Sequence, residues 1–199
     1  VMEPIIAALQ AGKPARSAAP DVQDKEATKC YKMLQLLTSK PVLYVCNVDE
    51  DSAATGNKFS EAVQKMATEE GAESVVISAE IESEVAQLES DSEKQEFLSA
   101  LGLEETGLAK IIRAGYNLLG LQTYFTAGPK EVRAWTFVKG MKAPQCAGII
   151  HTDFERGFIR AETISYDDYV QFGGEQGCKD AGTMRSEGKE YLVQDGDLM

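Results

Sequence analysis

The segment KPVLYVCNVDE, residues 40–50, decides the fold of the first part of this 199-residue chain. Its apolar run, residues 41–46, shows no alternation, which is typical of a strand buried on both faces of a parallel sheet. A second apolar run, residues 74–77, follows after an amphipathic segment, residues 58–70. Strand, helix and strand in this order predict an α/β layer with a parallel sheet.

Apolar residues at helical spacing predict the helices that surround these strands. In the segment 58–70 the pattern places Phe59, Val63 and Met66 on the inward face, and Gly71 ends the helix. The predicted helices cover residues 1–10, 21–37, 58–70, 82–88, 93–101 and 107–119.

The character of the chain changes at Leu121. Residues 122–126 and 131–137 are β-rich runs joined by Ala-Gly-Pro-Lys, which predicts a hairpin. Later segments predict short helices at 145–152 and 166–172 and strands at 157–164 and 191–193. We therefore expect two domains, residues 1–120 and residues 121–199, the second with a small α+β, ubiquitin-like fold.

The net charge of −12 argues against broad electrostatic binding of nucleic acid. The charge is uneven, because residues 1–120 hold 11 basic and 20 acidic residues, whereas residues 121–199 hold 9 and 12. The second part could therefore present a local basic patch with aromatic neighbours, as RNA-binding surfaces do. The candidate contacts to RNA or a partner are Arg133, Lys139, Lys142, His151, Arg156 and Arg160.

Cysteine and histidine are too sparse for a structural zinc site, and we expect no bound metal in this chain. Cys30, Cys46, Cys146 and Cys178 form no C-x-x-C pair, and His151 is the only histidine. We expect reduced thiols in a cytoplasmic protein. No apolar run approaches the roughly 18 residues of a membrane span, and residues 1–9 lack the basic flank of a secretory signal.

Polar residues follow both predicted strands at the carboxyl edge of the sheet, where α/β proteins bind ligands. GTPases of the P-loop class read guanine with N-K-x-D at one strand end and S-A-x at the next. In this chain, Val48 replaces the lysine and Glu50 replaces the aspartate. An aspartate suits the N1–H and 2-amino donors of guanine, which adenine lacks, while Asn47 can pair with N6 and N7 of adenine. The altered motif favours ATP.

Simpler structural roles remain open for these residues. Asn47 is also suited to a turn after a strand, and Ser78 to the N-cap of a helix. His151 could bond the turn that follows it instead of contacting RNA, and Trp135 is suited to the core. The acidic segments 80–84 and 89–96 are most simply solvated helix faces.

Eight runs, in the same order, resemble the YchF family, which comprises the Obg-like ATPases of the translation-factor class. The resemblance covers essentially the whole chain. The runs are GKPARS (12–17), KPVLYV (40–45), NVDE (47–50), VISA (76–79), TYFTAG (123–128), EVRAWT (131–136), HTDFERGFIRAE (151–162) and GKEYLVQDGD (188–197).

The resemblance implies a P-loop nucleotide domain, an inserted helical arm and a C-terminal TGS domain. Residues 1–120 would then be the end of the arm and the last part of the nucleotide domain, and residues 121–199 the TGS domain. The family hydrolyses ATP in preference to GTP and associates with ribosomes. Carried over, the base-binding residues are Asn47, Val48, Glu50, Ser78 and Ala79.

The chain departs from the family pattern because it has no G-x-x-x-x-G-K-[ST] sequence. The phosphate cradle is missing, so we expect Mg²⁺ only in the full-length parent and no ATP hydrolysis by this chain alone. The expected partners are the ribosome and RNA, through the TGS domain of a monomer, with no membrane and no reading of DNA sequence. The alternatives are a non-catalytic RNA- or protein-binding adaptor, and a thiol-dependent sensor that uses Cys46 and Cys146.

Overall fold

The computed structural model describes residues 2–199 and consists of two compact units. The first ends at Leu118 and the second is Leu119–Met199, so the division lies two residues before the start of strand β3 at Leu121. Within residues 2–199, no helix combines the length and the apolar character that a membrane span requires.

The first unit begins with short helices around a small core of Ile5, Ala15 and Tyr31. The predicted helix over residues 21–37 is shorter than expected: it starts after Asp24, whose side chain accepts the Ala27 N–H, and ends before the left-handed turn at Gln35. The elements are α1 (Met2–Gln10), η1 (Ala15–Ala18), α2 (Lys25–Met33) and η2 (Leu37–Ser39).

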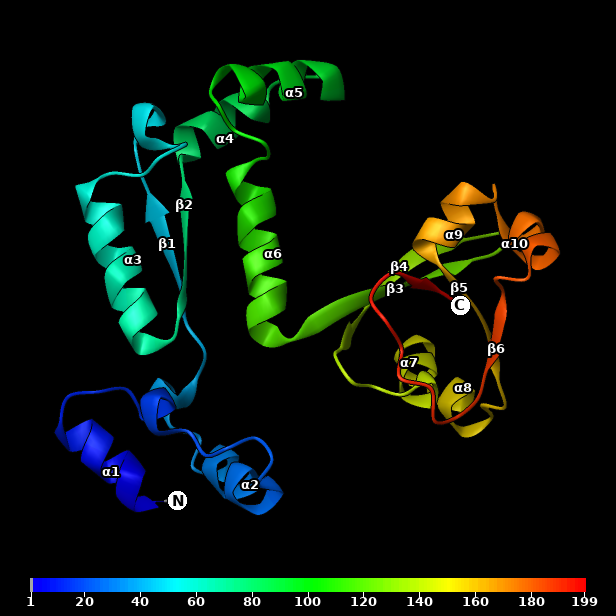
Figure 1. Cartoon of the computed structure of the whole chain (residues 1–199), viewed down its shortest axis with the longest axis horizontal. Coiled ribbons are helices and arrows are strands. Elements are labelled where there is room, and N and C mark those ends of the chain that lie inside the picture. The colour runs from blue at the N-terminus through cyan, green and yellow to red at the C-terminus, as the bar shows by residue number, and fades with distance from the viewer. Residues whose placement is uncertain (1) are drawn as a thin grey trace. The chain divides into compact units, whose positions relative to one another are not determined.

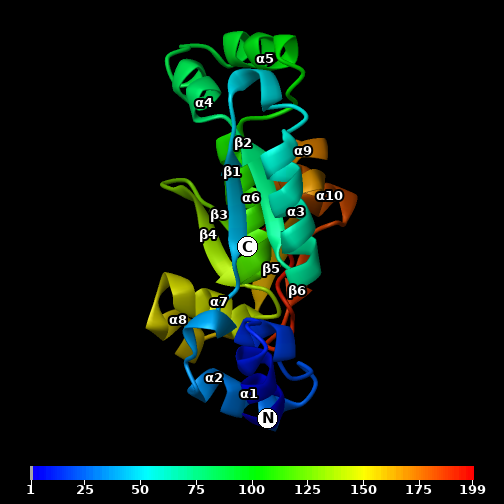
Figure 2. The ribbon, with the colours of Figure 1, turned by 90° about the vertical axis from the view of Figure 1, so that its left-hand side faces the viewer.

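Strands β1 (Leu43–Asn47) and β2 (Glu73–Ile77) pair in parallel, as predicted. Figures 1 and 2 show α4 and α5 at the end of this sheet where both strands finish. The remaining elements of the unit are η3 (Glu50–Ser52), α3 (Lys58–Glu70), α4 (Ala79–Val85), α5 (Asp91–Ala100) and α6 (Gly107–Leu119).

The predicted inward face of α3 is only partly right, although the bounds of the helix are right. Val63 is half-buried, but Phe59 is 70 % exposed and Met66 40 %, while Ser60 and Ala67 are buried. Ser60 and Ala67 each follow an exposed predicted residue by one position, so the buried face is shifted around the helix toward them. Small side chains on this face allow the helix to approach the strands closely.

The prediction that the first strand is buried on both faces is also wrong, because Val45 in β1 is 46 % exposed. Within the described residues, β1 pairs with β2 alone, so the sheet of this unit has two strands. A two-stranded sheet cannot cover both of its faces as a wide parallel sheet does.

The second unit is built on a mixed five-stranded sheet with the order β4-β3-β7-β5-β6. The predicted hairpin is confirmed as the antiparallel pair β3 (Leu121–Ala127) and β4 (Val132–Val138), and β3 also pairs in parallel with β7 (Asp197–Leu198). The other elements are α7 (Ala143–Ile150), α8 (Thr152–Arg156), β5 (Ala161–Ser165), α9 (Tyr166–Gln171), α10 (Glu175–Ala181) and β6 (Arg185–Glu187).

The core of the second unit lies between this sheet and α7. Tyr124 and Phe137 stack edge to face, and the Tyr124 hydroxyl donates a hydrogen bond to the Cys146 carbonyl at 2.8 Å. Trp135 is half-buried at the margin of this core, so its predicted place is only partly right. The predicted strand at 191–193 forms one isolated bridge, between Leu192 and Lys142.

Candidate nucleotide-base site and basic surface

The ends of β1 and β2 bring the predicted base-binding residues together. Asn47 and Ile77 are register partners, and the Val48 N–H donates to the Ile77 carbonyl at 2.9 Å. The segments that carry Asn47 and Ser78 therefore leave the sheet side by side. Asn47 and Ala79 are exposed at this edge, so a ligand can reach them.

Asn47 bridges the two strand ends through its side chain. Its Oδ1 accepts the Ala79 N–H at 2.9 Å, which caps the first turn of α4 from the neighbouring strand. Because a backbone N–H requires an acceptor, this bond fixes the orientation of the amide group. The Nδ2 donor and one lone pair of Oδ1 are left for a ligand.

These two remaining groups match one purine better than the other. The N7 and N6 edge of adenine offers an acceptor beside a donor, whereas N7 and O6 of guanine are both acceptors. A donor and an acceptor on Asn47 therefore complement this edge of adenine.

Ser78 does not cap α4, although it occupies the N-cap position. Its side chain makes no cap hydrogen bond, and its Oγ is buried without a partner among the described residues. The side chain adjoins a cavity of about 10 Å³ that Glu82 and Lys110 also line. Ser78 is therefore a buried polar group beside the base edge, and the helix-cap alternative is wrong for its side chain.

Glu50 lies at the same edge, half-buried at the start of η3. Partial burial raises the pKa of its carboxyl group, and the negative charges of Glu80 and Glu84 raise it further. Glu50, Glu80 and Glu84 therefore lie near enough to one another for their charges to interact. Within residues 2–199, no three His, Cys, Asp or Glu side chains come together as metal ligands.

Glu82 ties α4 to the start of α6. Its carboxylate accepts the Gly107 N–H at 2.6 Å and the Leu108 N–H at 3.2 Å, which places a negative charge at the helix N-terminus. A Cβ atom on Gly107 would lie 2.8 Å from Cγ2 of Ile77, so the close approach requires glycine. The contact between Glu82 and the start of α6 therefore fixes the position of α4, the helix that follows Ser78.

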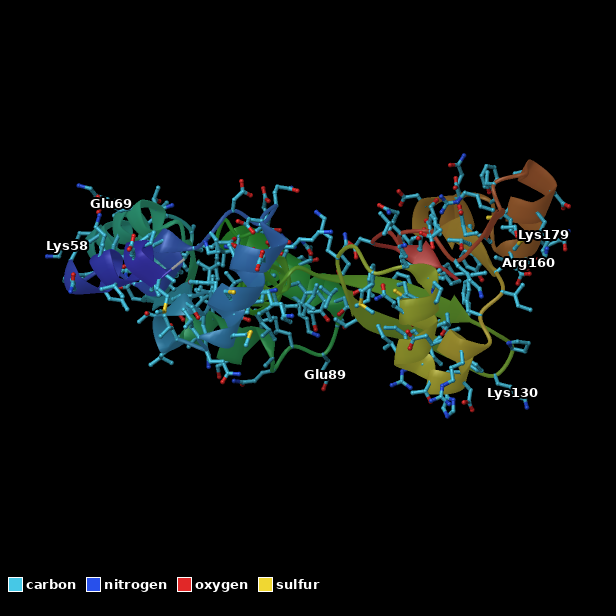
Figure 3. All side chains as sticks on the ribbon, turned by 90° about the horizontal axis from the view of Figure 1, so that it is seen from below. Lys58, Glu69, Glu89, Lys130, Arg160 and Lys179 are labelled. Carbon is cyan, nitrogen blue, oxygen red and sulfur yellow. The ribbon has the colours of Figure 1, made fainter. Side chains whose placement is uncertain are left out.

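The six basic candidates in the second unit lie on different elements, and some have structural partners. Arg133 on β4 stacks over the Trp135 ring at 4.0 Å, and Lys142 forms an ion pair with Glu190. Lys139 follows β4, and Arg156 ends α8. Arg160 projects outward from the segment before β5, as Figure 3 shows. All except Lys142, which is half-buried, are exposed.

His151 joins α7 and α8, and its ring has a structural partner. Its Nδ1 accepts the Asp153 N–H at 3.2 Å, which caps α8, and its ring contacts Phe154 edge to face. The structural alternative for His151 is therefore supported.

The thiol of Cys146 is fully buried, and burial raises its pKa to about 11. A thiol reacts as the thiolate, so Cys146 is unsuited to redox sensing.

Comparison with known proteins places this geometry in a family. The family model YchF-GTPase_C, described as "Protein of unknown function (DUF933)", matches residues 121–199. The curated "Ribosome-binding ATPase YchF" of Bacillus subtilis is 57% identical over 194 residues, 96% of this chain and 52% of that protein. The chain is homologous to the C-terminal part of the YchF and Obg-like ATPases.

Two further curated relatives indicate the same family. The Haemophilus influenzae protein of the same name is 53% identical over 100% of this chain and 53% of its own length. "Obg-like ATPase 1" of Rattus norvegicus is 44% identical over 90% of this chain and 45% of its length. The chain therefore spans about half the length of the curated relatives it matches.

A solved YchF structure confirms the α/β fold with a mixed sheet. "Structure of the Schizosaccharomyces pombe YchF GTPase" superposes with a TM-score of 0.81 at 36% identity, over 95% of this chain and 50% of that one. A more distant structure, "Crystal Structure of GTP binding protein from Pyrococcus horikoshii OT3", gives a TM-score of 0.55 at 18% identity, over 97% of this chain and 54% of that chain, and shows the fold alone.

Sequence reasoning missed the role of Glu82 near the ends of β1 and β2, because segment 80–84 has the composition of a solvated helix face. The unusual glycine at the start of α6 is the one signal that could have pointed to a close contact. The bond between Asn47 and Ala79 was also unforeseen, although the parallel strands predicted that the two segments are neighbours.

Proposed function

We propose that this chain is part of a ribosome-associated ATPase, in which residues 40–85 supply the recognition edge for adenine. The observation that carries the proposal is the bond from the Ala79 N–H to Asn47 Oδ1, which leaves a donor and an acceptor in the pattern that adenine requires. The names of the curated relatives, which are called ribosome-binding ATPases, support the same activity.

In this proposal, each residue at the edge has a role. Asn47 pairs with N7 and N6 of the base, and Ala79 holds the Asn47 amide in the required orientation. Val48 offers apolar and backbone contact, Ser78 lines the buried side of the edge, and Glu50 lies half-buried beside it in place of the motif's aspartate. ATP is then bound in preference to GTP. Phosphate and Mg²⁺ contacts would come from outside the residues described.

We further propose that the second unit is a TGS domain with a β-grasp fold that contacts RNA or the ribosome. The strand order β4-β3-β7-β5-β6, with β3 and β7 parallel at its centre, supports this fold. Arg133 over Trp135, with Lys139, Arg156 and Arg160, would supply the contacts, while Lys142 and His151 serve mainly structure. The protein would act as a cytoplasmic monomer.

Binding of ATP and GTP to the complete gene product tests the base edge. Asn47→Asp keeps an acceptor for Ala79 but removes the donor for N7, so we expect ATP affinity to fall about tenfold or more. Asn57→Asp is the matched control, because Asn57 caps α3 through its side-chain oxygen and an aspartate can do the same. Calorimetry should show unchanged ATP affinity for the control.

Two outcomes would overturn the proposal. If the complete protein binds neither nucleotide, the non-catalytic adaptor becomes the better assignment. If it binds ATP and Asn47→Asp has no more effect than Asn57→Asp, the edge does not recognise the base.

A further inference from the structure

A second basic surface lies on the first unit, on a helix that carries none of the base-edge residues. Lys25, Lys29 and Lys32 are spaced four and three residues apart on α2, so they share one face of the helix. We call these three residues the lysine row. All three are exposed, and together they line a hollow of about 450 Å³. Figures 1 and 2 show α2 beside α1, at the start of the unit.

The hollow continues along the helix. An adjoining hollow of about 540 Å³ shares Lys32 and Gln35 with the first and adds Lys40. The surface therefore carries four lysines beside the polar side chain of Gln35 and the exposed apolar side chains of Val22 and Met33.

The lysine row has no internal counter-charge. Within residues 2–199, none of its members forms an ion pair, and Glu26 on the same helix pairs with none of them. The nearby carboxylates of Asp21 and Asp24 accept backbone N–H groups of Gln23 and Ala27, both at 2.9 Å. The positive charge is thus left for a partner.

This charge also contrasts with its surroundings in sequence. Residues 25–48 hold four lysines and one acidic residue, Glu26, whereas residues 49–105 hold 16 acidic residues and three lysines. In a chain with a net charge of −12, an uncompensated basic row with a hollow beside it marks a surface for a polyanion.

We propose that the lysine row binds the phosphate backbone of RNA, independently of sequence. This proposal rests on the ribosome association proposed above, because a ribosome presents RNA phosphates, but it adds a contact surface on the first unit. The row is roughly 10 Å long from the helical rise of 1.5 Å per residue. Three lysines along this length can each contact a phosphate of one strand. The side-chain amide of Gln35 can donate a hydrogen bond to a phosphate or sugar oxygen.

A lipid surface fits the row less well than RNA. A helix that lies in a membrane interface needs a broad apolar face to insert. On α2, Tyr31 lies away from the lysine row and is buried against the core that contains Ile5 and Ala15. Within α2 the only large apolar side chain left exposed is Met33, its last residue, which is too little for the broad face that insertion requires.

RNA binding by the complete gene product tests the proposal. The probe is a fluorescein-labelled single-stranded RNA of 16 nucleotides, and anisotropy is measured between 50 and 200 mM KCl. The triple variant Lys25→Ala, Lys29→Ala, Lys32→Ala should bind at least tenfold more weakly at 50 mM. Its plot of log affinity against log salt should be shallower by about two, from 0.7 per lost phosphate contact.

The control variant removes three lysines of the first unit outside the row: Lys58→Ala, Lys65→Ala and Lys94→Ala. Lys58 extends into solvent at the start of α3 (Figure 3). Net charge then changes equally in both variants, and we expect the control to alter RNA affinity less than twofold. Circular dichroism should show that both variants fold as the parent does.

Each other outcome has a definite meaning. Equal weakening of both variants would assign the effect to net charge and overturn the row. If the triple variant binds RNA as tightly as the unsubstituted protein, the lysine row is not an RNA-binding surface, but the proposed RNA binding by the second unit still stands. If the unsubstituted protein does not bind RNA, both the lysine-row proposal and the proposed RNA binding by the second unit fail. Binding to vesicles of phosphatidylcholine and phosphatidylserine, without binding to RNA, would assign the row to lipid.

Discussion

The two units of the chain bury their apolar residues in different ways. In the second unit, five strands and α7 enclose one core around Tyr124 and Phe137. In the first unit, a two-stranded sheet separates two small clusters, one around Ile81 near the base edge and one around Tyr31. Phe59, Leu108 and Ile112 are each more than half exposed. The comparison shows that an amphipathic pattern specifies a helix, but the width of the sheet decides which face is covered.

The largest expected difference between the units is in the stability lost when one phenylalanine of each is replaced by alanine. Phe137 is 2 % exposed, so Phe137→Ala should lower the free energy of unfolding of the second unit by about 3–5 kcal/mol. Phe59 is 70 % exposed, and Phe59→Ala should change stability by less than about 0.5 kcal/mol. Urea unfolding followed by circular dichroism measures both. Comparable losses in the two variants would mean that Phe59 is covered in solution.

The sequence predicted most of the elements because their signals are local. The bounds of α3 follow from the capping box at Asn57 and from Gly71, and the hairpin from two β-rich runs around a turn. It also predicted that the strand ends lie together, since parallel strands end at one edge. It did not predict α10, whose seven residues include a glycine and begin after two more.

What sequence reasoning could not supply depends on contacts between distant elements. Glu82 binds N–H groups 25 and 26 residues away, and nothing in segment 80–84 distinguishes this carboxylate from its solvated neighbours. The burial of Ala67 in place of Met66 likewise depends on how closely α3 approaches the strands. Such choices are made by tertiary packing, which a local pattern does not contain.

Glu82 provides a prediction of intermediate size within the first unit. Glu82→Gln keeps one acceptor but loses the charge and the second bond at the start of α6, so the unit should lose about 1–2 kcal/mol. Amides at the start of α6 should exchange faster with deuterium. Glu84→Gln on the same helix is the control, because Glu84 is exposed, and it should leave that exchange unchanged. Equal protection in both variants would show that the contact does not hold α6.

The remaining predicted effect is a response to alkaline pH in the second unit. Burial raises the pKa of Cys146 from 9.0 to about 11, so between these values the unfolded chain has released a proton that the folded unit still holds. Stability is then present in full below pH 9 and declines as the pH rises to about 11. Tyr191, whose pKa burial and Asp197 raise to about 12, adds a decline of the same sign at higher pH.

Trp135 reports on this unit alone, because it is the only tryptophan of the chain. Urea midpoints from its fluorescence should fall between pH 9 and 11 in the parent and in Cys30→Ala, which alters an exposed cysteine. In Cys146→Ala the decline over this range should be weaker, since the titrating thiol is gone. If Cys146→Ala shows the same decline as the unsubstituted protein, burial does not raise the pKa of the Cys146 thiol, because water reaches the core around it. The core of the second unit would then be less closed than its contrast with the first unit requires.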